Sequence, residues 1–171
     1  MRKGKKKKQP FGPEDYVVYP AHGVGQIAQI EKREIAGVVQ ELFVVFFAKD
    51  KMTLCVPTSR ALEIGMRALS SPAVLDKAKK TLRGRAKAKR GMWSRRAQEY
   101  EQKIHSGDLI AIAEVVRDLH RSDDQGEQSY SERQLYESAF ERLTREFAAI
   151  EGADEGTTAQ SVGKLLTKRA S

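Results

Sequence analysis

The first regular hydrophobic pattern along the chain is a series of four short β-rich runs between residues 15 and 57. The runs read DYVVYP, VGQIAQIEKREI, VVQELFVVFFA and MTLCVP, and the turns AHG, AG and KDK separate them. Short strands joined by tight turns that carry Gly or Asp are typical of small all-β modules. The pattern therefore predicts a small antiparallel β-barrel or a curled sheet.

Two details refine this β module. Ile27 and Ile30 do not share one face under strict alternation, so we expect a bulge or bend near residues 28–29. Pro57 has no N–H to donate to a ladder, which predicts that the last long strand ends there.

Helical spacing replaces the β pattern after about Leu62. Ser71 followed by Pro72 is a favourable N-cap and first helical position, and a partial apolar stripe follows it at Val74, Leu75, Ala78 and Leu82. A second helix is predicted from about Ser94 to Gly107, with apolar positions at Ala97, Tyr100 and Ile104.

Two further helices complete a predicted bundle. Asp108 is a good N-cap for the run LIAIAEVVRDL, whose broad apolar face predicts the buried central helix. Ser131 and Gln134 form a capping box for the next helix, in which Leu135, Ala139, Leu143 and Phe147 share a face; Gly152 ends it.

The predicted fold class is therefore α+β, with an N-terminal small antiparallel β-barrel followed by an α-helical bundle domain. We expect a flexible basic arm at 1–12, a β module at 13–65 and a helical module at 66–152. A tail at 153–171 has room for a short helix through Val162, Leu165 and Leu166.

The charge is concentrated in two segments. The 171 residues carry a formal net charge of +8; residues 2–8 contribute six cations, residues 77–96 contribute ten and no acid, and the remainder sums to 8 − 16 = −8. Two basic segments on an otherwise acidic chain favour a polyanionic partner, with nucleic acid the leading candidate. The arm before Gly12 fits a solvated tail as well as a DNA-binding arm.

Candidate chemistry is sparse. Cys55 is the single cysteine, which excludes a disulfide framework and favours a small apolar strand residue over a reactive thiol. His22, His105 and His120 are scattered, and HGVG at 22–25 lacks the lysine of a P-loop. We expect a non-enzyme without metal or cofactor. The longest apolar runs are too short to span a bilayer and no signal-peptide pattern follows the first residues, so a cytoplasmic protein is expected.

The only tryptophan, Trp93, lies in KAKRGMWSRRAQEY, between the basic run and a helix start. Large aromatic side chains usually pack in a core. Minor-groove-binding proteins, however, combine cations with an apolar wedge, and helix N-termini attract phosphate. We therefore expect a protruding ring, and we expect Trp93→Ala to leave the melting temperature almost unchanged.

Three separated stretches resemble one known family. DYVVYPAHGVGQI, WSRRAQEYEQKIHSGD and IAEVVRDLHRSD occur in this order, and the similarity runs from about Phe11 to Ile150. Together they resemble the CarD family, also called CdnL, of bacterial transcription regulators. The resemblance implies a Tudor-like module that docks on the RNA polymerase β subunit, and a helical module that contacts promoter DNA.

In that family, a tryptophan matching Trp93 wedges into the minor groove at the upstream edge of the transcription bubble. The DNA-contacting candidates implied here are Trp93, Arg95, Arg96, Met92, Arg90, Lys89, Lys87 and Arg133. The polymerase-contacting candidates are Arg33, Glu34, Ile35, Leu54, Cys55, Val56 and Pro57. Cys55 departs from the pattern, because some relatives have an arginine there that helps the polymerase contact.

The resemblance thus implies a monomer, nucleoid-associated through RNA polymerase, that stabilises the promoter open complex without turning over a substrate. Two alternatives differ in class. A KOW- or Tudor-like protein acting on RNA or the ribosome would fit GVGQIAQI, but residues 9–63 carry five basic and seven acidic side chains. The polymerase-binding part of a transcription-repair coupling factor would require a helicase P-loop, which this chain lacks.

Overall fold

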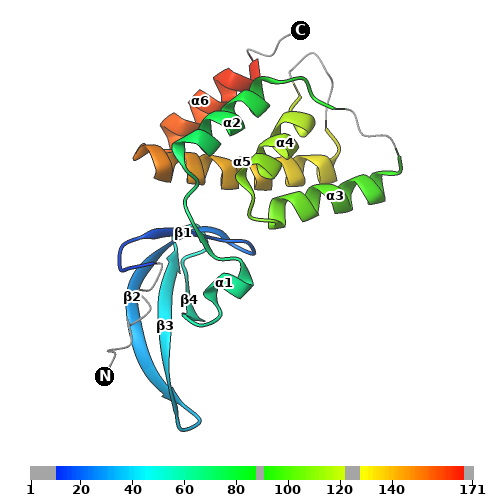
Figure 1. Ribbon diagram of the computed structural model, residues 1–171. Helices are drawn as coiled ribbons and strands as arrows, with labels where there is room; N and C mark the ends of the chain where they lie inside the picture. Colours follow the sequence, from blue (N-terminus) through cyan, green and yellow to red (C-terminus); the bar gives the residue numbers. More distant parts are fainter. Residues whose placement is uncertain (1–10, 88–90, 122–127, 168–171) are drawn as a thin grey trace. The chain divides into compact units, whose positions relative to one another are not determined.

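The computed structural model describes residues 11–87, 91–121 and 128–167, and the chain divides into two compact units at Ala68/Leu69 (Figure 1). We call residues 11–68 the β unit and residues 69–167 the helical unit. The β unit therefore extends three residues beyond the expected boundary at 65.

The β unit is a single antiparallel sheet with the strand order β4-β3-β2-β1-β5. Its strands are β1 (Tyr16–Tyr19), β2 (Gly23–Ile35), β3 (Val38–Phe47), β4 (Met52–Pro57) and β5 (Arg67–Ala68). A four-residue helix, α1 (Ala61–Ile64), precedes β5. The four long runs predicted from the sequence are all strands, and the α+β class is confirmed.

A bulge in β2 decides which side chains reach the core of the sheet. The register between β2 and β3 shifts between Ile27 and Gln29, as predicted. The extra residue lets both Ile27, which is fully buried, and Ile30, which packs against the core, face the same side. The other buried residues of this core are Phe11, Val17, Phe43, Val45, Phe47, Val56, Ala61 and Met66.

The described residues of the helical unit form five helices. They are α2 (Pro72–Arg83), α3 (Trp93–His105), α4 (Leu109–Leu119), α5 (Tyr130–Glu151) and α6 (Glu155–Thr167). Three predicted end signals are confirmed: the Ser71 hydroxyl accepts from the backbone N–H of Val74, Asp108 accepts from that of Ile110, and Gly152 ends α5 at φ 63°.

The expected capping box at Ser131 and Gln134 is wrong. Helix α5 begins two residues earlier, where the Ser129 hydroxyl accepts from the backbone N–H of Glu132 at 3.2 Å. Ser129 and Glu132 have the same three-residue spacing as Ser131 and Gln134, so the capping-box pattern occurs twice and the earlier copy caps the helix.

Helix α4 forms the centre of the helical unit, because it packs against α2, α3 and α5. Val115 and Val116 are fully buried there. Helix α6 packs against α2 and α5, beside which it runs in Figure 1, and its Val162 and Leu166 belong to the same core. Residues 155–167 are thus an integral part of the helical unit. No helix in the described ranges is both long and apolar enough to cross a membrane.

Candidate functional site

Trp93 is the first residue of α3. Gly91, at φ 123°, turns the chain in a conformation that side-chain-bearing residues rarely adopt, and Met92 then takes an extended N-cap conformation. Met92 makes no side-chain cap hydrogen bond and is 77% exposed. The start of α3 therefore presents a large apolar side chain to solvent, and that side chain does not cap the first backbone amides of the helix.

The Trp93 ring itself is partly buried and packs against the helical core. Its centroid lies 6.4 Å from that of Tyr100, and the Arg96 guanidinium carbon lies 5.5 Å from the centroid of its ring. The expectation of a protruding ring is wrong, and the expectation that Trp93→Ala leaves the melting temperature almost unchanged loses its basis with it. Trp93 continues the stripe of Ala97, Tyr100 and Ile104 at helical spacing, a signal present in the sequence, and this stripe faces the bundle.

The exposed side of Trp93 lines a hollow of about 390 Å³ between α3 and α5. Ser131, Gln134 and Leu135 form the opposite wall, so the first turns of both helices border the same hollow. Arg133 also lies in this first part of α5, where it is exposed and 3.6 Å from the carboxylate of Glu137. Arg133 therefore belongs to the same turn of α5 as Ser131 and Gln134, but it is not among the residues that line the hollow.

The remaining DNA-contacting candidates differ in their surroundings. Arg95 is exposed, whereas Arg96 is partly buried against Trp93. The side chain of Lys87 is exposed, and its backbone N–H donates to Asp118 at 2.9 Å. Lys89 and Arg90 lie outside the described residues.

The β unit carries the polymerase-contacting candidates on two faces of the sheet. Val56 is buried and Leu54 packs against the core, so these two side chains point inward. Cys55 alternates with them and is exposed. It lies in a strand, as expected, but its thiol faces away from the core.

Arg33 lies on the same exposed face as Cys55. Its Nε and Nη2 donate to the two carboxylate oxygens of Glu31 at 3.0 and 3.1 Å. This hydrogen-bonded pair raises the pKa of the Arg33 guanidinium above its ordinary value, with a smaller electrostatic contribution from Cys55. In the antiparallel register, Cys55 pairs with Val44 and Arg33 with Gln40.

The last candidates lie near these strands. Ile35 is 48% exposed at the end of β2, Glu34 is exposed on the opposite face of the hairpin, and Pro57 is partly buried. In the described part of the chain, β4 is at one end of the strand order. Its outer edge therefore carries backbone groups that are outside the ladder.

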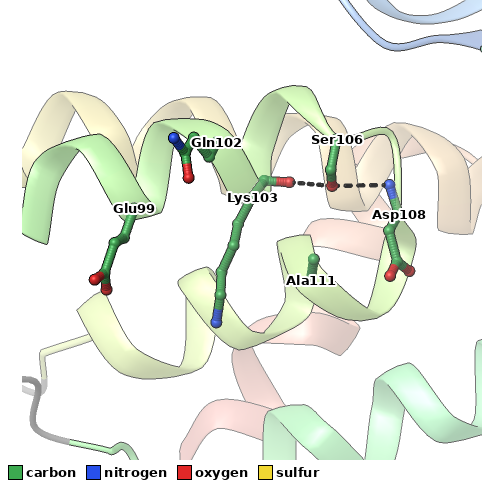
Figure 2. Close-up of a pocket in the computed structure, with 6 residues that line it drawn as sticks. All are labelled: Glu99, Gln102, Lys103, Ser106, Asp108 and Ala111. Atoms are coloured by element: carbon green, nitrogen blue, oxygen red, sulfur yellow. Dashed lines mark hydrogen bonds between the residues drawn. The ribbon is translucent and has the colours of Figure 1, made fainter.

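Another hollow, of about 370 Å³, lies where α3 meets α4 (Figure 2). There the Ser106 hydroxyl donates to the Lys103 carbonyl at 2.6 Å and accepts from the backbone N–H of Asp108 at 3.2 Å. Lys103 also pairs with Glu114 at 2.7 Å. These polar groups join the two helices to each other. Within the described residues, no three His, Cys, Asp or Glu side chains gather to hold a metal ion.

Comparisons with known proteins agree with the division into two units. A family model described as "CarD-like/TRCF RID domain" matches residues 11–70, and one described as "CarD, C-terminal domain" matches residues 77–162. The chain is also 30% identical over 141 residues to a protein of Bacillus subtilis (strain 168) named "Putative transcription factor YdeB". That similarity covers 82% of this chain and 92% of the relative.

Proposed function

The chain belongs to the CarD family of transcription regulators, and from that premise we propose that it binds the RNA polymerase β subunit and stabilises the promoter open complex. The observation that carries the proposal is the start of α3. There, Trp93, exposed Met92 and exposed Arg95 share one turn of a unit that matches the CarD C-terminal model. An apolar surface beside cations suits a distorted minor groove.

The packing of Trp93 sets how such a wedge acts. The inner part of the ring is fixed by Tyr100 and by the Arg96 guanidinium, so its orientation is set before DNA is bound. The side of the ring toward the hollow and the neighbouring Met92 form the surface available to an unstacked base step. Arg95 and Arg133 supply positive charge for the adjacent phosphates.

The β unit supplies the polymerase contact in this proposal. An edge strand offers backbone hydrogen bonds that do not depend on side-chain identity, so the outer edge of β4 suits pairing with a strand of the β subunit. Arg33 and Cys55 lie on the exposed face of the same sheet. A contact of this kind tolerates cysteine at position 55, because the backbone provides most of it.

The test measures two properties of the full-length protein. It should copurify with RNA polymerase rather than with ribosomal subunits, and its addition should lengthen the lifetime of open complexes. A footprint of the promoter complex should change at the upstream edge of the bubble. Copurification with ribosomal subunits would favour the RNA-binding alternative, and unchanged lifetimes on every promoter tested would contradict the proposal.

A further inference from the structure

A buried carboxylate in α4 accepts a hydrogen bond from the backbone of Lys87, in the chain after α2. The Asp118 side chain is 2% exposed, and its Oδ1 accepts from the Arg117 Nε at 2.8 Å and from the backbone N–H of Lys87 at 2.9 Å. The second bond joins residues 31 positions apart in the sequence. It fixes the chain after α2 to the C-terminal turn of α4.

The Arg117 side chain lies close to the start of the same segment. Gly84 ends α2, and a Cβ placed on it would lie 3.8 Å from the Arg117 Cδ. The Arg117 side chain is 11% exposed, so its stem lies in the interior beside Gly84. Asp118 thus binds the backbone at residue 87, and the Arg117 side chain lies close to residue 84. The side chains of Arg85 and Lys87 are exposed.

Judged by its charge alone, Asp118 should weaken DNA binding. A carboxylate near a cationic DNA-binding segment is expected to repel phosphate. Asp118 is largely out of solvent and is paired with a guanidinium at 2.8 Å, so little of its charge acts at a distance. Its hydrogen bond to the Lys87 backbone therefore affects DNA binding more than its charge does, because a hydrogen bond to a buried charged acceptor is stronger than one between neutral groups.

We propose that Asp118, held by Arg117, is a positioning residue for DNA binding. It fixes the backbone at Lys87 so that Arg85 and Lys87 project their cations from an ordered segment. Ordering the segment before binding removes part of the entropic cost of placing those cations on phosphates. This inference rests on the proposed contact between the helical unit and DNA.

The proposal is tested by whether removal of the Asp118 carboxylate weakens or strengthens DNA binding. Asp118→Ala and Asp76→Ala each change the net charge from +8 to +9, and Asp76 is an exposed residue of α2. Binding of the full-length protein to a fluorescein-labelled duplex is measured by anisotropy over a range of salt concentrations. Asp76→Ala should bind slightly more tightly. Asp118→Ala should bind roughly tenfold more weakly near 0.1 M salt, as expected for the loss of one phosphate contact.

A second pair of variants leaves the Arg117–Asp118 ion pair intact and so avoids an unpaired buried guanidinium. Lys87→Ala and Lys87→Pro both remove the cation, but only proline also removes the N–H that donates to Asp118. Lys87→Pro should bind DNA several-fold more weakly than Lys87→Ala when both are measured below their melting temperatures, because proline lowers stability as well by removing a donor from the buried Asp118 carboxylate. Equal affinities for these two variants would overturn the positioning role.

The outcomes separate this inference from the proposed function. If the wild-type protein binds DNA and Asp118→Ala tightens binding as Asp76→Ala does, the positioning role is wrong and the proposed function stands. If the wild-type protein binds no DNA at low salt, the proposed DNA contact is wrong and the positioning role is overturned with it.

Discussion

Trp93 and Met92 are adjacent residues whose substitution should separate stability from function. Trp93 is partly buried, so Trp93→Ala should destabilise the helical unit by about 2 kcal/mol, less than a fully buried tryptophan. Met92 is 77% exposed, so Met92→Ala should leave the melting temperature unchanged. Both variants should shorten the open-complex lifetime. The lifetime assay is run below the melting temperature of Trp93→Ala, as checked by circular dichroism.

Trp93→Phe is the matched control, because it keeps an aromatic ring against Tyr100 while reducing the exposed surface. A normal lifetime with folded Met92→Ala and folded Trp93→Ala would remove the wedge from the proposed mechanism. The protein would then act on DNA through its cations alone.

Arg33 and Lys32 are neighbours on β2 whose side chains alternate between the two faces of the strand. Arg33→Glu should weaken copurification with RNA polymerase strongly, because it removes the exposed cation beside Cys55 and leaves two carboxylates, at positions 31 and 33, on one face. Lys32→Glu makes the same charge change on the opposite face and should have little effect. Equal loss in both variants would assign the effect to net charge rather than to this face.

The sequence predicted the secondary structure around these residues better than their packing. Cys55 was correctly placed in a strand and Trp93 at a helix start, yet the exposure of Trp93 was misjudged. Cys55 is exposed because it lies at an outward-facing position of β4, which is fixed by the register with β3. Trp93 was judged by its charged neighbours, whereas the approach of α5 to the first turn of α3 determines its burial.

At the scale of helices and strands, the sequence predicted those caps and bulges that depend on a few adjacent residues. The bulge after Ile27 and the caps at Ser71, Asp108 and Gly152 follow from a few adjacent residues. Strand β5 was not predicted, because two residues are too few to produce a period. It exists through its pairing with β1, a contact about 50 residues distant in sequence, for which Val17 pairs with Ala68.

Helix α6 was weakly predicted because glycine and threonine lower its helix propensity, although its packing against α2 and α5 stabilises it. Gly163 has open space where a Cβ would be, so Gly163→Ala should stabilise the helical unit by about 1 kcal/mol in chemical denaturation. Gly156→Ala is the comparison, since its Cβ would lie 3.0 Å from the Asp154 carboxylate and part of the gain should be lost. A destabilising Gly163→Ala would contradict this account of α6.

For the whole molecule, DNA binding depends more on how the charge is distributed along the chain than on the net charge. Residues 77–96 hold ten cations, while the chain outside this segment and residues 2–8 is net acidic by eight. Contacts within the helical unit leave fewer cations available to contact DNA. Lys79 pairs with Glu151 at 3.0 Å, and the Arg96 guanidinium lies over the Trp93 ring. The segment therefore offers fewer phosphate contacts than its composition suggests.

This distribution predicts weak, salt-sensitive binding of the isolated protein to DNA. Each phosphate contact contributes about −0.9 to the slope of log K against log salt concentration, so the eight cations that remain after Lys79 and Arg96 set a limit of about −7 rather than about −9 for ten contacts. Lys79→Ala should leave the slope unchanged because its charge is already paired, whereas Arg95→Ala should reduce it by about one. Duplexes of unrelated sequence should bind alike, because phosphate contacts carry no base code. Tight, salt-insensitive binding to one sequence by the isolated protein would show that base contacts, and not placement by RNA polymerase, determine where it acts.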